Sequence, residues 1–195
     1  MDNQTNQKKQ FDFEKKQHLG LIRGTVCLVP HDDYWECNAQ KTISLLWSVL
    51  DKIAIDIQHI GSTSIKNIHA KPIIDIVVGL KQLDDILPYI TLLKEKNIFF
   101  RGEERTEQLL FVKGDFTKDT RTHHIHIAIW NSDIWNNYIA FRDYLNEFPE
   151  KAIKYDVVKM NLAQLYSNDR NTYTNEKNEI ISKLLIEAKV WKSST

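Results

Sequence analysis

A carboxylate in the middle of an apolar segment is the first feature of this sequence that could do chemistry. Residues 71–80 read KPIIDIVVGL, a pattern typical of a β-strand buried on both faces, and Asp75 stands at its centre. An ionised carboxylate buried without partners costs several kcal/mol. It therefore requires a cation, a metal ion or hydrogen-bond donors, unless it takes up a proton. We interpret Asp75 as a functional carboxylate; the alternative is a structural Asp satisfied by backbone groups or a salt bridge.

A short polar loop precedes that strand. Residues 59–64 read HIGSTS, and Gly61 allows the backbone to approach a ligand closely. Three hydroxyls follow it, and such loops can hold phosphate oxygens through hydroxyl and backbone N–H groups. The loop is not a Walker A motif, because it lacks the second glycine and the lysine. We predict a phosphate-binding loop made of Gly61, Ser62, Thr63 and Ser64, with a plain turn as the alternative.

A histidine-rich segment forms the third candidate element. Residues 121–130 read RTHHIHIAIW, and strand alternation places His124 and His126 on one face, about 6–7 Å apart along the backbone. Two imidazoles at this spacing can share one metal ion with a carboxylate such as Asp75, or they can hydrogen-bond a phosphate. We therefore predict Asp75, His124 and His126 as catalytic and metal-ligating residues. The alternative is a pair of solvated strand histidines.

Cations interrupt the apolar stripes of three helices predicted near the C-terminus. The helices cover residues 132–148, 149–167 and 172–191, and their stripes carry Arg142, Lys159 and Lys177 respectively. A single basic side chain on such a stripe usually extends its charged end to water. Three in succession predict a shared anion, for which phosphate is the natural candidate. Lys71 and Arg121 add positive charge near the predicted loop and strand.

The remaining pattern predicts how these residues are positioned. Strands are predicted near residues 25–29, 55–60, 71–80, 98–102, 107–115 and 121–130. Two further helices are predicted at residues 33–52 and 83–97, and Pro88 opens or bends the second of them. The layout is α+β, with a mixed sheet first and helices packed on it afterwards. We expect a flexible arm at residues 1–20 and a single domain at 21–195.

Composition narrows the class of protein. The 195 residues contain 26 basic and 26 acidic side chains, so the formal net charge is zero, which argues against a general nucleic-acid binder. No apolar segment reaches membrane-spanning length, and the N-terminus has no secretory pattern. Cys27 and Cys37 lack metal-binding spacing, so we expect reduced thiols in a cytoplasmic protein.

These segments together resemble a known family. The stretch HIGSTSIKNIHAKPIIDIVVGL resembles the signature of the GrpB family, and RTHHIHI, W..YIAFRDYL...P, Y..VK..LA and Y...K..II extend the similarity from Val29 to the end. The resemblance implies a branch of the nucleotidyltransferase superfamily with a polymerase-beta-like core. In that superfamily, a Gly-Ser pair and several carboxylates hold divalent ions around a nucleoside triphosphate. Gly61 and Ser62 would be the pair, and Asp75 the first carboxylate.

Two departures from the superfamily pattern affect the predicted chemistry. Val77 stands where the second carboxylate is expected, and His124 and His126 stand where a third is expected. Mg²⁺ prefers oxygen ligands, so one Asp with two His suits Mn²⁺ or Zn²⁺ better. The site could therefore also bind a nucleotide without catalysing its reaction.

Three functions follow as expectations. The leading one is nucleotidyl or phosphoryl transfer, in which the loop holds the phosphates of a nucleotide or another phosphorylated ligand. Cations then neutralise the phosphate charge. They are Lys71, Arg121, Arg142, Lys159 and Lys177. The second is a nucleotide-binding or accessory module without turnover, which the valine at position 77 favours. The third is a metal-dependent hydrolase that uses the His-x-His strand.

Overall fold

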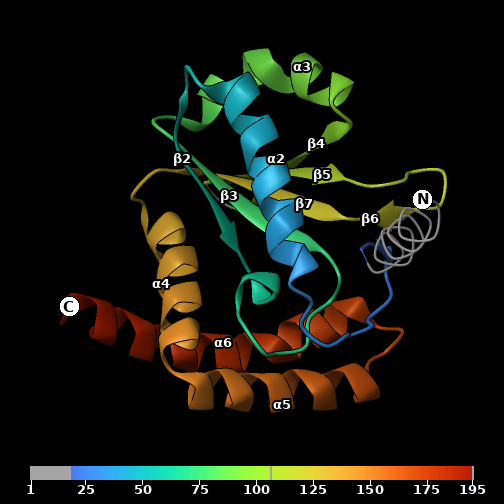
Figure 1. The fold of residues 1–195 in the computed structure, drawn as a ribbon, viewed down its shortest axis with the longest axis vertical. Helices are drawn as coiled ribbons and strands as arrows, with labels where there is room; N and C mark the ends of the chain where they lie inside the picture. The colour runs from blue at the N-terminus through green and yellow to red at the C-terminus, as the bar shows by residue number, and fades with distance from the viewer. Residues whose placement is uncertain (1–18, 106, 195) are drawn as a thin grey trace, which may run out of the picture.

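The protein is built on a five-stranded mixed sheet (Figure 1). The computed structural model describes residues 19–105 and 107–194, with the backbone alone at residues 104 and 105. The strand order is β2-β3-β7-β5-β4, in which β3 and β7 are parallel and the other neighbours are antiparallel. The strands are β2 (Ala54–Ile60), β3 (Ile74–Leu80), β4 (Ile98–Arg105), β5 (Gln108–Lys113) and β7 (His123–Ile129). A separate two-stranded ladder pairs β1 (Leu21–Ile22) with β6 (Thr120–Arg121).

Helices cover both faces of the sheet, which confirms the predicted α+β architecture (Figure 1). On one face, α2 and the even-numbered residues of β3 share the largest buried cluster. On the other face, Trp135 of α4 packs with Val77 of β3 and Ala128 of β7. The helices are α2 (Tyr34–Leu50), α3 (Ile90–Glu95), α4 (Asp133–Glu147), α5 (Pro149–Leu165) and α6 (Arg170–Ser193), with 3₁₀ turns η1 (Ser62–Ser64) and η2 (Leu83–Tyr89). Strand β3 is thus buried from both sides, as its sequence predicts.

The last two helices lie across the end of the sheet from which η1 emerges (Figure 1). Ile65 and Ile68, in the connection between β2 and β3, are fully buried in a cluster with residues of α4, α5 and α6. Burial of these apolar side chains holds the C-terminal helices against the loop. Residues about a hundred positions apart in the sequence therefore meet at this end of the sheet.

Two strand predictions need correction. Residues 25–29 do not form a strand: Val29 makes an isolated bridge to Ala70, and the N–H of Val26 bonds to the carbonyl of Ser167. This segment lies against loops, where no neighbouring strand offers a continuous ladder. The segment predicted as one strand at residues 121–130 is interrupted at Thr122, because its first residues pair with β1 instead of the main sheet.

Helix boundaries also differ from the prediction. Pro88 lies inside η2, and α3 begins only at Ile90, because proline has no N–H for an α-helical hydrogen bond. Helix α6 begins at Arg170, where the Asp169 side chain accepts a hydrogen bond from the N–H of Thr172.

The remaining organisational expectations concern the ends of the chain and the membrane. Most of the predicted arm at residues 1–20 lies outside the described residues, so its division from a domain at 21–195 stays a prediction. Within residues 19–105 and 107–194, no helix combines the length and the apolar composition needed to cross a membrane.

Candidate functional site

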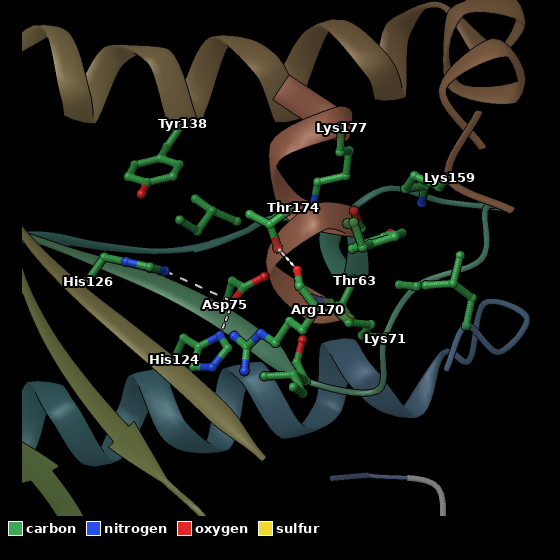
Figure 2. A pocket seen from close by; sticks show the side chains of 17 residues that line it. Thr63, Lys71, Asp75, His124, His126, Tyr138, Lys159, Arg170, Thr174 and Lys177 are labelled. Atoms are coloured by element: carbon green, nitrogen blue, oxygen red, sulfur yellow. Dashed lines mark hydrogen bonds and ion pairs between the residues drawn. The ribbon is translucent and has the colours of Figure 1, made fainter. Parts of the chain in front are cut away.

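A cavity of about 210 Å³ lies between the end of the sheet, the η1 loop and helices α5 and α6 (Figure 2). It is open on one side, and its lining comes from every element that the sequence marked for chemistry. Its polar residues include Ser62, Thr63, Lys71, Asp75, His124, His126, Tyr138, Lys159, Arg170, Tyr173, Thr174 and Lys177. Asp75 is the one carboxylate among the described residues that line it.

Two histidines surround the carboxylate of Asp75. Asp75 pairs with His124 in the parallel register of β3 and β7, and its Oδ1 accepts a hydrogen bond from His124 Nδ1 at 3.1 Å. His126 Nε2 lies 4.0 Å from the same oxygen (Figure 2). Burial alone raises the pKa of Asp75, but the hydrogen bond from His124 and the electrostatic interactions with His124, His126 and Lys71 lower that pKa to about 2. Asp75 is therefore an ionised carboxylate that imidazole donors stabilise.

Gly61 brings the loop backbone into contact with this carboxylate. Its φ of 72° lies in the left-handed region, which favours glycine. A Cβ at this position would be 2.3 Å from Asp75 Oδ2 and 2.8 Å from Asp75 Cβ. Any side chain here would collide with a residue held in the middle of a buried strand, so the close approach requires glycine.

The three loop hydroxyls have different partners. Ser62 Oγ lies 3.3 Å from Tyr155 Oη at the cavity wall. Thr63 Oγ1 is buried 3.0 Å from His59 Nε2, and Ser64 Oγ donates to the carbonyl of Gly61. The prediction that all three hydroxyls hold phosphate is therefore narrowed: those of Thr63 and Ser64 already have hydrogen-bond partners within the protein, and that of Ser62 lies at the cavity wall.

Three cations at the cavity lack a carboxylate partner among the side chains that the structure describes. Lys71 and Lys177 place their ammonium nitrogens 5.3 and 5.4 Å from the ring centroid of Tyr173, and Arg170 lies at the same wall (Figure 2). Burial, followed by the positive charges of Lys177 and Arg170, lowers the pKa of Lys71 to about 7. The crowding of like charges means that this wall would be stabilised by an anion.

Lys159 has a more structural position. Its side chain is 1% exposed, and its ammonium donates to the carbonyl of His69 and lies 3.4 Å from Asp156 Oδ1. Burial lowers its pKa to about 8 despite the nearby Asp156. Through its bond to the His69 carbonyl, Lys159 connects α5 to the turn that precedes Lys71. The carboxylate of Asp156 offsets part of the lysine's positive charge.

Two predicted phosphate ligands do not reach the cavity. Arg142 donates to the carbonyl of His59 and pairs with Asp143, and it lines a separate cavity of about 490 Å³ beside α2. Arg121 is buried against the ring of Phe116 and lies 3.0 Å from Asp119. The packing of α4 turns Tyr138 towards the cavity and Arg142 towards the edge of β2.

Four polar residues that line the cavity were absent from the prediction, and one of them, Arg170, is a cation; the other three are Tyr138, Tyr173 and Thr174. Arg170 is the first residue of α6, and the predicted helix began two residues too late to include it. Arg170 precedes Thr174 by four residues and Lys177 by seven, so in a helix all three lie on one face. A predicted helix that began at Arg170 would therefore have indicated Arg170 as a cavity residue.

The hydrogen bonds around Asp75 determine what the imidazoles present to it. Tyr138 Oη donates to Gln108 Oε1, and Gln108 Nε2 donates to His126 Nδ1 at 2.6 Å. His126 therefore carries its proton on Nε2, the nitrogen nearer Asp75. His124 likewise directs its Nδ1 proton to Asp75. Both imidazoles thus present N–H groups to Asp75 in this arrangement, and a metal ion bound here would have to displace those protons.

The surrounding donor set leads to the same conclusion. Val77 is fully buried against Trp135, so the position of the expected second carboxylate faces the core. Among the described side chains, no three carboxylates, imidazoles or thiols gather in a metal-binding group. As arranged, these residues do not fit a divalent ion such as Mg²⁺, Mn²⁺ or Zn²⁺. The predicted metal role of Asp75, His124 and His126 is not supported by this geometry.

Comparison with known proteins places the fold and its family. Residues 25–187 match the family model described as GrpB protein. The "Glutamate-rich protein GrpB" of Alkalihalophilus pseudofirmus is 40% identical over 87% of this chain and 99% of that protein. Two longer relatives are 32% and 34% identical, and the chain spans 65% and 50% of their lengths. The crystal structure of conserved protein GrpB from Enterococcus faecalis has a TM-score of 0.78 at 29% identity, covering 85% of this chain and 99% of that one.

A more distant likeness concerns the fold alone. The Cid1 poly(U) polymerase, in a structure with Mg 3′-dATP bound, has a TM-score of 0.50 at 13% identity and covers 87% of this chain and 53% of that one. The predicted nucleotidyltransferase-like fold is thereby confirmed. Because the family model covers most of the sequence and a 40% identical relative matches over almost its full length, this protein belongs to the GrpB family.

Proposed function

We propose that this protein binds a nucleotide or another phosphorylated small molecule in the cavity, and that side-chain cations replace a divalent ion there. The observation that carries the proposal is the set of three cations at one wall, Lys71, Arg170 and Lys177, without carboxylate partners among the described side chains. Phosphate oxygens are the strongest common acceptors for such groups. The fold likeness to a polymerase whose structure holds Mg 3′-dATP supports a nucleotide as the ligand class.

Asp75 then has a role other than metal binding. Its carboxylate orients His124 through a hydrogen bond and lies 4.0 Å from His126 Nε2, and its negative charge is close to the cations of the cavity. A second candidate function is nucleotidyl or phosphoryl transfer, which the Asp75–His124 hydrogen bond favours, because a carboxylate that orients an imidazole prepares it for proton transfer. A metal-dependent hydrolase is a less favoured function, since its reaction requires a metal-bound water.

The first test removes one cation. Lys177→Met should weaken the binding of ATP and of inorganic tripolyphosphate by about 10- to 100-fold, because a charge-assisted hydrogen bond to phosphate is lost. Dissociation constants are measured by calorimetry in a buffer that contains EDTA. The matched control is Lys183→Met, on the same helix but exposed and paired with Glu179. Equal affinities for the two variants would contradict the proposed phosphate site.

The second test separates a cationic site from a metal site. Asp75→Asn keeps the shape and one acceptor for His124 but removes the negative charge. If the side chains bind phosphate directly, we expect ATP to bind about tenfold more tightly in EDTA, since a repulsive charge within the cavity is gone. A metal-dependent transferase would instead lose both ATP affinity and pyrophosphate release with Mg²⁺ or Mn²⁺ present. Loss of affinity on this substitution, together with a metal requirement in the wild type, would overturn the proposed role of the cations.

A further inference from the structure

The amine of Lys71 lines the cavity without an acceptor for its hydrogen atoms. Its nitrogen lies 5.3 Å from the ring centroid of Tyr173, and no carboxylate or carbonyl oxygen of the described residues bonds to it. The side chain is partly exposed, and its nitrogen keeps access to the cavity. Lys159, at the same wall, is 1% exposed and already bonded to His69 and Asp156. Unlike Lys159, Lys71 therefore offers an amine that a small ligand can reach without breaking an existing contact.

The charges around this amine disfavour its protonated form. Lys177 and Arg170 act on it from α6, and the carboxylate of Asp75 in β3 acts in the opposite direction. Burial and the two cations outweigh Asp75, so the pKa of Lys71 is about 7. At neutral pH roughly half of the molecules therefore carry a neutral amine, which is the nucleophilic form of lysine.

Lys71 and the two α6 cations reach the cavity from different elements. Lys71 stands in the segment that precedes β3, whereas Arg170 and Lys177 stand on one face of α6 (Figure 2). The nitrogens of Lys71 and Lys177 lie 5.3 and 5.4 Å from the ring centroid of Tyr173. Because both nitrogens border the same ring, a small ligand held by Lys177 is also within reach of Lys71, and such proximity accelerates a reaction between them.

The electrophile that suits this arrangement is a carbonyl carbon joined to phosphate. Attack at phosphorus has to overcome the negative charge of the oxygens around it, which metal ions neutralise in phosphoryl transfer. An acyl carbon carries no such charge, and its phosphate leaving group gains negative charge as the bond breaks. Arg170 and Lys177 stabilise that charge. The cavity volume of about 210 Å³ is below that of drug-sized pockets, so the acyl group is a small one.

We propose that Lys71 is a modification site that small acyl phosphates acylate while Arg170 and Lys177 hold the phosphate group. The Lys71 nitrogen attacks the acyl carbon, an amide bond forms, and the bond between that carbon and the phosphate oxygen breaks. The electron pair of the broken bond and the proton of the amine both leave with the phosphate, as hydrogen phosphate. The inference rests on the proposed function, because the same cations bind the phosphate.

The first experiment follows the acetylation of single lysines by peptide mass spectrometry, at pH 8 in EDTA. Acetyl phosphate should modify Lys71 about tenfold faster than Lys66, an exposed lysine in the same connection between β2 and β3. Inorganic tripolyphosphate should protect Lys71 and leave Lys66 unaffected, because it competes for the cations. With the N-hydroxysuccinimide ester of acetic acid, which has no phosphate, the preference for Lys71 should be about tenfold smaller.

The second experiment measures what the modification does to the cavity. An amide at position 71 has no positive charge, so treatment with acetyl phosphate should weaken tripolyphosphate binding by about tenfold in calorimetry. Lys71→Arg keeps the charge without the reactive amine, so the same treatment should leave its affinity unchanged. The matched control is Lys66→Arg, which should lose affinity as the wild type does.

The outcomes separate this inference from the proposed function. If tripolyphosphate binds the wild type but acetyl phosphate modifies Lys71 no faster than Lys66, the modification site is overturned and the phosphate site stands. Equal preferences for Lys71 with the two acetylating reagents would also overturn it, since the phosphate would then direct nothing. Failure of tripolyphosphate to bind the wild type would overturn the phosphate site and this inference together.

Discussion

Lys71→Met is expected to raise the melting temperature of this protein and, in the same variant, to weaken phosphate binding. The Lys71 ammonium is half-buried among Lys177 and Arg170, and its pKa falls from 10.5 to about 7. Each pKa unit corresponds to about 1.4 kcal/mol of unfavourable interaction with the charged form. Because water reaches part of the side chain, we expect a stabilisation of about 2 kcal/mol, less than the full shift implies. For a domain of this size that is about 4–8 °C in melting temperature.

The same substitution should stabilise the fold but weaken the binding of phosphate. Without Lys71, the affinity for tripolyphosphate in EDTA should fall by about 10- to 100-fold, since one charge-assisted contact disappears. The matched control is Lys66→Met in the same loop, where the lysine is exposed and should change neither quantity appreciably. A lower melting temperature for Lys71→Met would show that the lysine stabilises the fold. Unchanged affinity would show that it does not touch the ligand.

The stability difference should depend on pH. Between pH 7 and 10.5 the unfolded chain holds the Lys71 proton and the folded protein releases it, so the unfolded state binds more protons. The free energy of unfolding contributed by this group therefore rises with pH across the window and is lost again as pH falls towards 7. Chemical denaturation of wild type and Lys71→Met at pH 7 and pH 10 should show the variant's advantage shrinking at the higher value.

Gly61→Ala should destabilise the protein by about 4 kcal/mol, the largest single-residue effect that we expect. Two physical causes add: a left-handed φ with extended ψ, which is almost restricted to glycine, and a collision of the new Cβ with Asp75. Asp75 Cβ, 2.8 Å away, belongs to a buried strand and cannot move aside as a flexible side chain would. Urea denaturation measures the change, and phosphate binding should be lost with it.

A second glycine allows the cost of the backbone conformation to be measured separately from the cost of the collision with Asp75. Gly24 also has a positive φ, of 90°, but a Cβ there would meet nothing within 4 Å. Gly24→Ala should therefore cost about 1 kcal/mol, the conformational part alone. Adding Asp75→Gly to Gly61→Ala should recover part of the stability, since it removes the colliding Cβ and carboxylate. Equal costs for the two alanine variants would mean that contact with Asp75 does not explain Gly61.

The alternation of strand residues explains why much of the site could be predicted. A period of two places Asp75 on one face of β3 and His124 and His126 on the same face of β7, and the structure has this arrangement. The apolar neighbours of Asp75 predict a buried strand, because a strand covered on both faces has no polar side. These inferences depend on local geometry alone, so no knowledge of distant contacts was needed.

The helices show where such reasoning fails. Arg142, Lys159 and Lys177 have the same pattern in sequence, a cation on an apolar stripe. In the structure, Arg142 donates a hydrogen bond to the carbonyl of His59 in β2. Lys159 bonds to the His69 carbonyl and pairs with Asp156, whereas Lys177 lines the cavity. A period of 3.6 defines a stripe but not the rotation of the helix about its axis or the neighbour that it faces.

Taken by itself, the sequence determined the α+β class, the faces of the strands, the family signature and the residues around Asp75. Only the tertiary structure decided which cations lack carboxylate partners, which loop hydroxyls are already bonded, and that Gln108 directs the proton of His126 towards Asp75. The physical reason is the distance along the chain over which each effect acts. Side-chain alternation acts between neighbours along the chain, whereas charge pairing and hydrogen-bond direction depend on groups that packing brings together from distant segments.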